Sequence, residues 1–231
     1  MTLDKIEESL FNQFVTEQVE KMRLERNKRL KGKKSFAPVV TVSIQPGSGG
    51  CFIADGIANH LEFDFFYREI VQEVAKSVKI SPEVIEKIEK DRLSGVEDLI
   101  ASFVPDRYLW PGMYLEHLER IVYAIGDSGK AVIVGRGANF ILPPEKRFSL
   151  RVVAPLEIRV QNIMEAYGVS EQKAMKRIKN RQEKRKAFIK KSFNADVEDP
   201  LHYDLVVNTG TVSIDEAVEA VSLFISKKYG V

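Results

Sequence analysis

From residue 39 onward, apolar residues follow two recurring patterns. Short runs of β-branched residues are bounded by Gly, Pro or Asn, and between them apolar side chains return every third or fourth position. The first pattern predicts buried strands, and the second predicts helices with one buried face. Because the two alternate, the sequence predicts an α/β fold whose mainly parallel sheet is covered by helices on both faces. The expected strands cover residues 39–44, 63–67, 131–135, 148–154 and 204–208.

Several of the intervening helices have recognisable starts. Ser81-Pro82-Glu83 starts a helix within the mostly helical region 69–125, since a capping residue followed by proline favours the first turn. Ser170 is predicted to cap a long basic helix, and Ser213 with Glu216 forms a capping box before the last one. Helices are therefore expected from about 51 to 61, within 69–125, at 156–166, at 171–191 and from 214 onward.

The first 38 residues differ from the rest. Apolar side chains form one stripe over residues 3–30, which predicts an amphipathic helix, and residues 21–34 carry eight Lys or Arg against one Glu. We interpret residues 1–38 as a helical appendage with a basic tail and residues 39–231 as one domain. The helix would pack on this domain or on a second subunit, as in a homo-oligomer; a nucleic-acid or membrane-surface role is the alternative.

Composition narrows the class of protein. The chain has 231 residues, 44% of them apolar, which is enough for one sizeable core, and its net charge of +2 does not single out a partner. Cys51 is the only cysteine, which excludes an internal disulfide and favours a reducing compartment. The N-terminus does not resemble a signal peptide and no segment is apolar enough to span a bilayer, so we expect a cytoplasmic protein without a membrane partner. The three histidines lack metal-ligand spacing, and we expect no metal ligands in the protein.

A glycine-rich loop, Gln45-Pro46-Gly47-Ser48-Gly49-Gly50, joins the first strand to the helix that begins near Cys51. Such a loop collects backbone N–H groups at a helix N-terminus and is a candidate anion site, although a tight turn without ligand is the alternative. The full phosphate-binding motif is G-x-x-x-x-G-K-[ST]. Here Gly50 and Cys51, or Cys51 and Phe52, stand in place of the lysine and the hydroxyl residue.

Four segments together indicate a family. They are Val42-Ser43 with the glycine loop, residues 132–142, residues 153–159, and Asp199-Pro200 with residues 203–210. Their order and spacing resemble the cytidylate kinase-like family from residue 39 to about 228. The resemblance implies a P-loop kinase fold: a three-layer α/β/α arrangement with a five-stranded sheet and a helical lid at about 168–195. It also implies ATP with Mg2+ as the phosphoryl donor and a nucleoside monophosphate or similar small acceptor.

The resemblance further implies roles for individual residues. Gly47, Ser48, Gly49, Gly50 and Cys51 would cradle the donor phosphates. Arg136 would hold the phosphate of the acceptor, and Tyr67 would stand in the substrate site at the end of the second strand. Arg159 and Arg185 would act near the transferred phosphoryl group and in the lid, where residues 176–191 include nine Lys or Arg. Arginine suits these roles because its planar fork binds phosphate oxygens in pairs and keeps its charge.

The chain departs from the family pattern at several charged positions. Gln45 stands where relatives have an acid, and Cys51 stands where they have an arginine. Aspartates of the family pattern are replaced by Tyr67 and Gln182. Gly137 replaces a further aspartate, the one that helps to recognise cytosine. Each change removes a contact to phosphate, metal, base or ribose. An alternative to the kinase is therefore a non-catalytic nucleotide-binding or scaffold protein. A third hypothesis, nucleic-acid binding through 21–34 and 176–191, is disfavoured because no aromatic stacking pattern accompanies the basic residues.

Overall fold

The computed structural model describes residues 37–67, 70 and 111–231. The predicted helix at 3–30 and most of the region 69–125 lie outside these residues. In the described part, five strands form one sheet in the order β2-β3-β1-β4-β5, and every neighbouring pair is parallel. The strands are β1 (Val39–Ile44), β2 (Asp64–Phe66), β3 (Ala131–Val134), β4 (Arg147–Val153) and β5 (Leu205–Asn208).

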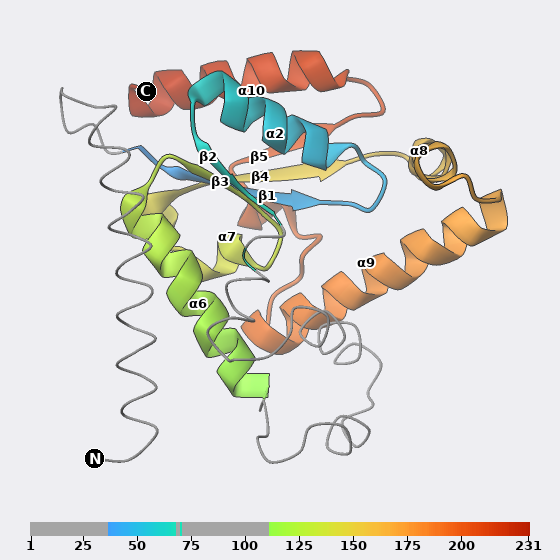
Figure 1. The fold of residues 1–231 in the computed structure, drawn as a ribbon, viewed down its shortest axis with the longest axis horizontal. Coiled ribbons are helices and arrows are strands. Elements are labelled where there is room, and N and C mark those ends of the chain that lie inside the picture. The colour runs from blue at the N-terminus through green and yellow to red at the C-terminus, as the bar shows by residue number, and fades with distance from the viewer. Residues whose placement is uncertain (1–36, 68–69, 71–110) are drawn as a thin grey trace.

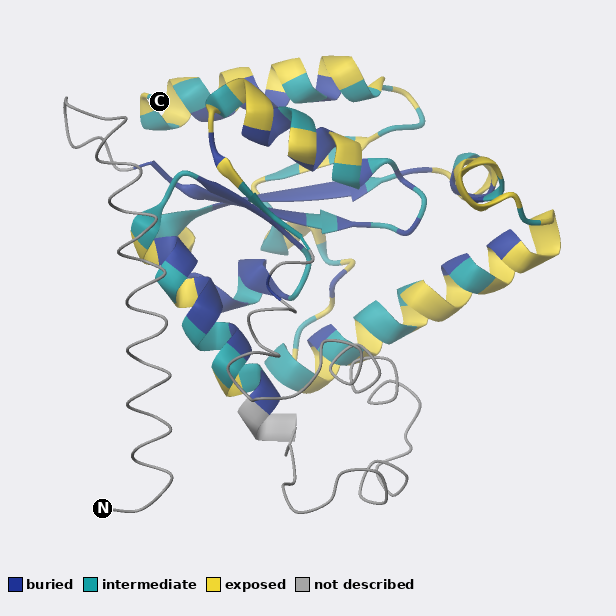
Figure 2. Ribbon diagram, viewed as in Figure 1, coloured by how far each residue is buried: buried dark blue, intermediate teal, exposed yellow. Residues whose placement is uncertain are grey.

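Helices cover both faces of the sheet, as predicted (Figure 1). One face is covered by α2 (Gly50–Leu61) and α10 (Ile214–Tyr229), and the other by α6 (Pro111–Ser128) and the short α7 (Ala138–Ile141). Alternation along β1 divides the core: Val40 and Val42 face α2 and α10, whereas Val39 joins the cluster around α6. Figure 2 shows the central strands buried and the outer faces of the helices exposed. The three-layer α/β fold is confirmed.

Two further helices, α8 (Leu156–Tyr167) and α9 (Glu171–Phe193), lie outside the layers. In Figure 1, α8 lies beyond the arrowheads of β1 and β4, and α9 runs from it back beneath the sheet. Gly168 adopts a left-handed conformation (φ 59°) at the end of α8, which turns the chain into α9. The two helices share a small core of their own, formed by Val160, Ile163, Ala174 and Ile178. Of the two, α9 lies in the region predicted as the lid, residues 168–195, whereas α8 precedes it.

The predicted helix starts agree with the structure for the last helix and only in part for α9. The capping box is confirmed: the Glu216 N–H donates to Ser213 Oγ at 3.3 Å, and the Ser213 N–H donates to Glu216 Oε2 at 2.9 Å. Ser170 precedes α9 as predicted, but its side chain forms no capping hydrogen bond. The short elements α7, η1 (Pro144–Lys146) and η2 (Pro200–His202) were not predicted, because single turns have no apolar period.

No helix in the described ranges has the length and apolar character needed to cross a membrane.

The contact beneath Gly50 gives a first prediction. A Cβ atom at this position would overlap the side chain of Ile44 and lie 3.0 Å from Val152 Cβ. We expect Gly50→Ala to lower the free energy of unfolding by about 1–3 kcal/mol, because overpacking displaces the end of the sheet. Urea denaturation measures this value. The control is Phe52→Ala, since Phe52 is 72% exposed on the same helix and should change stability by less than about 0.5 kcal/mol. Wild-type stability of Gly50→Ala would show that the loop has room for a side chain.

Candidate phosphate-binding site

The residues predicted for the site follow consecutive strands at one edge of the sheet. The glycine loop follows β1, Tyr67 follows β2, Arg136 follows β3 and Arg159 lies in the helix after β4. In a parallel sheet these carboxyl ends share one edge. Strand order also reverses here, because β3 and β4 flank β1 on opposite sides. Open α/β sheets bind ligands at such a switch point.

The glycine loop curls tightly over the end of β1. Gly47 (φ 84°) and Gly49 (φ 73°) are left-handed, and the Ser48 N–H donates to the Gln45 carbonyl at 3.1 Å. A Cβ atom at Gly47 would lie 2.5 Å from the backbone oxygen of Arg159, so this approach requires glycine. The first turn of α2 follows directly, and its N–H groups lack helical partners by geometry. The loop therefore has the backbone of an anion site.

Three neighbouring segments hold this loop in place. Asn162 Nδ2 of α8 donates to the Gly47 carbonyl at 2.8 Å, and Thr209 Oγ1 after β5 donates to the Ser48 carbonyl at 2.8 Å. Gln45 Oε1 accepts a hydrogen bond from the backbone of Ala154 at 3.1 Å, which gives this amide a structural role where relatives have an acid. Sequence reasoning missed Asn162 and Thr209, because their contacts span more than 100 residues. These hydrogen bonds fix the shape of the loop before a ligand binds, which lowers the entropic cost of binding.

The loop itself supplies no cation. A side chain at position 50 would overlap Ile44 and Val152, so none can extend from there to a phosphate. Ser48 is buried, and its Oγ has no hydrogen-bond partner among the described residues. Cys51, at the start of α2, is only partly buried and presents a thiol. Positive charge at this site must therefore come from other elements.

Three arginines supply that charge at the junction of β1 and the loop. Arg151 Nη1 of β4 donates to Ser43 Oγ at 2.7 Å, and Arg185 Nη1 of α9 donates to the Ile44 carbonyl at 2.6 Å. Because Ser43 and Ile44 are consecutive, the two guanidinium groups lie near the same strand end. Arg159, whose backbone lies against Gly47, donates from Nη1 to Gln182 Oε1 at 3.1 Å. The structure thus brings together the loop and both arginines predicted to be catalytic.

All three guanidinium groups have neutral hydrogen-bond partners. Within the described part of the chain, none of them forms an ion pair with a carboxylate. Arg159 is 7% exposed and Arg151 is 6% exposed. The Nε atom of Arg159 is buried without a hydrogen-bond partner among the described residues. Unpaired buried charge is costly in a folded protein, and an anion would relieve that cost.

The pKa shifts of the arginines have the same origin. Burial lowers the pKa of Arg185; the nearby Tyr67 and Cys51 act in the opposite direction, and the charges of Arg181 and Arg151 lower it further. Burial also lowers the pKa of Arg159, where Glu198 and Glu157 oppose the shift and Arg151 adds to it. The guanidinium groups remain charged at neutral pH. They therefore repel one another within a cluster that also includes the predicted residues Tyr67 and Cys51.

Arg151 was not predicted from the sequence, which we interpreted at 148–154 as an apolar strand. The missed signal is a charge in the middle of a strand whose neighbours are buried. The guanidinium carbon lies 5.6 Å from the centroid of the Tyr203 ring, and Tyr203 is itself held by a 2.8 Å hydrogen bond from its hydroxyl to the Val197 carbonyl. Such ring contacts stabilise a desolvated cation.

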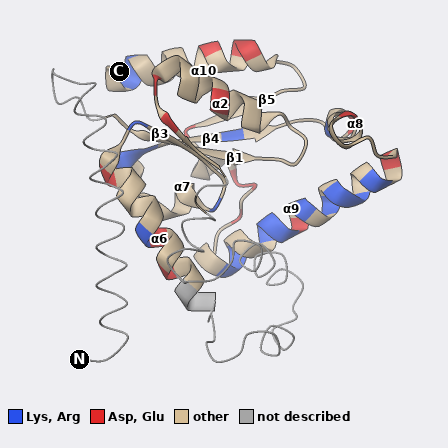
Figure 3. Ribbon diagram, in the orientation of Figure 1, with Lys and Arg blue, Asp and Glu red and all other residues tan. Residues whose placement is uncertain are grey.

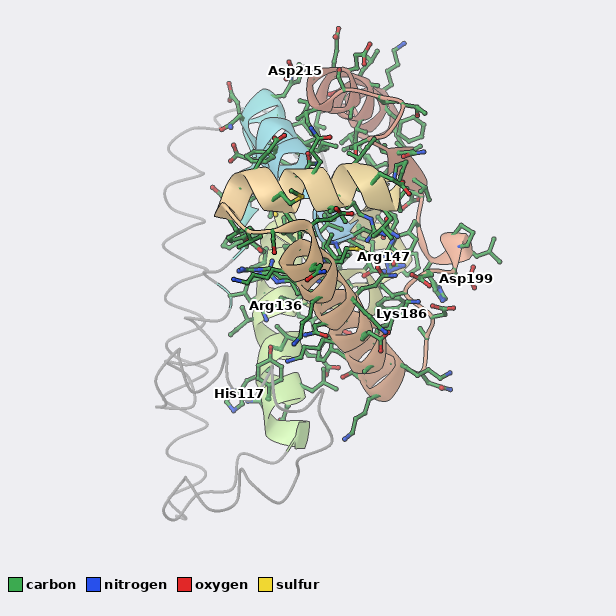
Figure 4. All side chains as sticks on the ribbon, turned by 90° about the vertical axis from the view of Figure 1, so that its right-hand side faces the viewer. His117, Arg136, Arg147, Lys186, Asp199 and Asp215 are labelled. Carbon is green, nitrogen blue, oxygen red and sulfur yellow. The ribbon has the colours of Figure 1, made fainter. Side chains whose placement is uncertain are left out.

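Arg136 lies in a strained turn after β3. Its φ of 58° is left-handed, and it stands between the left-handed Gly135 and Gly137. Non-glycine residues in this conformation are costly, and they cluster at functional sites. A Cβ atom at Gly137 would overlap the ring of Phe193 at the end of α9, so the aspartate of base-reading relatives has no room here. Figure 4 shows Arg136 and Lys186 on opposite sides of α9.

Helix α9 is strongly basic, as Figure 3 shows, but several of its arginines have partners within the molecule. Arg177 and Arg181 lie 3.8 Å and 6.0 Å from the centroid of the Tyr167 ring, and Arg185 reaches the end of β1. Gln182 links Arg159 to Glu198, which also forms an ion pair with Lys186. One network therefore connects α8, α9 and the segment after α9 to the phosphate site.

Arg159 gives a second prediction. We expect Arg159→Met to raise the free energy of unfolding by about 1 kcal/mol, because it removes a buried unpaired charge at similar volume. The same change should weaken binding of inorganic tripolyphosphate about tenfold. Urea denaturation and titration calorimetry measure the two effects. Lys179→Met, an exposed change on α9, should alter neither. Lower stability with unchanged affinity would instead make Arg159 a structural residue.

Comparison with known proteins identifies the family. The chain matches the cytidylate kinase-like family over residues 39–211. It is 25% identical over 192 residues to a cytidylate kinase of Methanopyrus kandleri, covering 79% of this chain and 90% of that protein. A cytidylate kinase of Ignicoccus hospitalis is 26% identical over 188 residues, covering 79% and 96%. A solved structure, an uncharacterized protein from Eubacterium ventriosum, has a TM-score of 0.63 at 20% identity over 82% of this chain and 98% of that one, which supports the fold alone. Because the family match spans most of the sequence, this chain belongs to the cytidylate kinase-like family.

Proposed function

We propose that this protein is an ATP-dependent phosphotransferase that acts on a nucleoside monophosphate or a similar small acceptor. The observation that carries the proposal is the convergence of Arg151, Arg159 and Arg185 on a preformed glycine loop at the switch point of the sheet. Membership of the cytidylate kinase-like family supports kinase-type phosphoryl transfer.

The donor half of the proposed site is the glycine loop with its surrounding arginines. Backbone N–H groups of residues 47–51 and the N-terminus of α2 would hold the donor phosphates. Arg159 and Arg185 would offset the charge that spreads over the transferred phosphoryl oxygens. Phosphoryl transfer requires mainly positioning and charge stabilisation, so no general base or covalent residue is needed for this role.

The acceptor half would lie toward β2 and β3. Arg136 follows the strand next to β1, in a strained turn at the shared edge of the sheet. We propose that it binds the acceptor phosphate through paired hydrogen bonds. Tyr67 stands at the end of the neighbouring strand, close enough to Arg185 to raise the pKa of its guanidinium. We propose that Tyr67 contacts the same substrate.

Family resemblance also implies Mg2+, but the described residues do not fit a metal ion held by the protein. Among them, no group of three or more His, Cys, Asp or Glu side chains could hold a metal ion. The loop offers the Cys51 thiol and a buried Ser48 hydroxyl, whereas Mg2+ prefers accessible oxygen ligands. None of the steps proposed above runs through a metal ion.

The proposal predicts turnover on one class of acceptor. Purified protein would be incubated with ATP and a panel of nucleoside and deoxynucleoside monophosphates, with and without MgCl2, and diphosphate products would be separated by chromatography. We expect turnover on a subset of the panel. Arg136→Ala should reduce kcat/KM for that acceptor at least about 100-fold, because a paired contact to phosphate is lost.

Lys179→Ala removes one exposed charge from the lid and serves as the matched control, with kcat/KM expected within about twofold of wild type. Failure of folded protein to phosphorylate any acceptor, together with measurable ATP binding, would support the non-catalytic nucleotide-binding alternative. Turnover that survives Arg136→Ala unchanged would remove Arg136 from the acceptor site.

A further inference from the structure

The charge balance of the loop site differs from that of a site built around a metal-bound phosphate. In the usual motif a lysine and a hydroxyl residue follow the last glycine, and the hydroxyl is a ligand of Mg2+. Here Gly50 is closed to any side chain by Ile44 and Val152, and the next residue is Cys51. A thiol is a poor ligand for Mg2+, which selects oxygen atoms.

Guanidinium groups occupy the surroundings of the loop instead. Arg151 and Arg185 bind consecutive residues at the end of β1, and Arg159 lies against Gly47. Each has a neutral oxygen as its partner, namely a hydroxyl, a backbone carbonyl or an amide. A phosphate oxygen carries more negative charge than any of these and would bind the same N–H groups more strongly.

Two of the positions expected to hold acids in relatives are amides here, and a third is Tyr67, which lies near Arg185. Gln45 binds the backbone of Ala154, and Gln182 accepts from Arg159. Glu198, the acidic side chain of this network, is engaged by Lys186 and Gln182. Glu157 also acts on Arg159 and is exposed near the start of α8. Within the described residues, the cluster therefore holds more cations than carboxylates.

We infer that the loop binds its phosphate ligand as the metal-free polyanion, with Arg151, Arg159 and Arg185 supplying the charge of both the loop lysine and the metal ion. This inference rests on the proposed function in taking a polyphosphate as the ligand. Mg2+ cancels part of the negative charge of a polyphosphate. It would also be repelled by three guanidinium groups that have no carboxylate partner among the described residues. Association with Mg2+ should therefore weaken binding at this site, whereas it strengthens binding where carboxylate and hydroxyl oxygens receive the ion.

The test is a calorimetric titration of the full chain with ATP and, separately, with inorganic tripolyphosphate. Each titration is run in EDTA and again in excess MgCl2 at equal ionic strength, because screening alone weakens charge interactions. We expect dissociation constants in MgCl2 to be at least about tenfold higher than in EDTA for both ligands. The measurement uses wild-type protein and so does not depend on any variant folding.

Variants of Arg185 test whether the arginines cause the weaker binding in MgCl2. Arg185→Met should weaken binding in EDTA about tenfold and bring the ratio of the two dissociation constants toward one. Arg185→Lys keeps the charge and should retain most of the ratio, although it loses paired hydrogen bonds. Lys179→Met, exposed on the same helix, should leave both constants unchanged. An unchanged ratio in Arg185→Met would exclude Arg185 from the effect and overturn the inference as stated.

Two other results are distinguishable. Tighter binding of ATP in MgCl2 than in EDTA would overturn the inference and leave the proposed function standing. No binding of either ligand in either buffer, by protein with a cooperative melting transition, would overturn both, since the loop would then not be a polyphosphate site.

Discussion

The contact of Gly50 with the side chains of Ile44 and Val152 is the constraint on which the rest of the site depends. Ile44 and Val152 are register partners on the neighbouring strands β1 and β4, so Gly50 lies across the carboxyl end of the sheet at its centre. Absence of a Cβ atom lets the first turn of α2 approach the strand ends directly. The loop is thereby fixed in shape, but it loses the position from which a lysine could reach a phosphate.

Charge therefore reaches the loop from β4, α8 and α9. Each of the three arginines is anchored by an uncharged oxygen, and two of them are almost completely buried. Without an anion this arrangement costs stability, because buried charge is only partly compensated by neutral partners. Proteins accept such costs where a ligand later offsets them, and strained or desolvated residues gather at functional sites for the same reason.

Four of the five departures from the family pattern remove a negative charge, and only that at Cys51 removes a positive one. Gln45 and Gln182 keep hydrogen bonds in places where an acid would add negative charge, and Gly137 leaves room for the ring of Phe193. A site that had only lost its ligand would have no physical reason to keep Arg159 buried with an unpaired Nε atom. This pattern favours a site adjusted to a more negative ligand over one that has stopped binding.

The small core between α8 and α9 joins α9 to the helix that carries Arg159. Val160 and Ile163 pack on Ala174 and Ile178 near the turn at Gly168, while Arg159 and Gln182 meet farther along. At the other end of α9, Phe193 stacks on Phe140 of α7, with ring centroids 5.5 Å apart. Helix α9 is therefore held at both ends, and Arg185, which reaches β1, projects from the span between them.

Local periodicity and short motifs were enough to predict the alternation of strands and helices, the glycine loop, the capping box at Ser213 and the family. The sequence placed β1 at residues 39–44, as observed, and it indicated that the loop lacks a lysine. Tertiary structure alone decided which distant side chains complete the site. Arg151 looked like one charge in an apolar strand, and Asn162 and Thr209 looked like ordinary polar residues, until the parallel sheet brought the ends of β1, β4 and β5 together. Hydrogen bonds between residues more than 100 positions apart have no signature in local sequence, because they depend on which strands become neighbours.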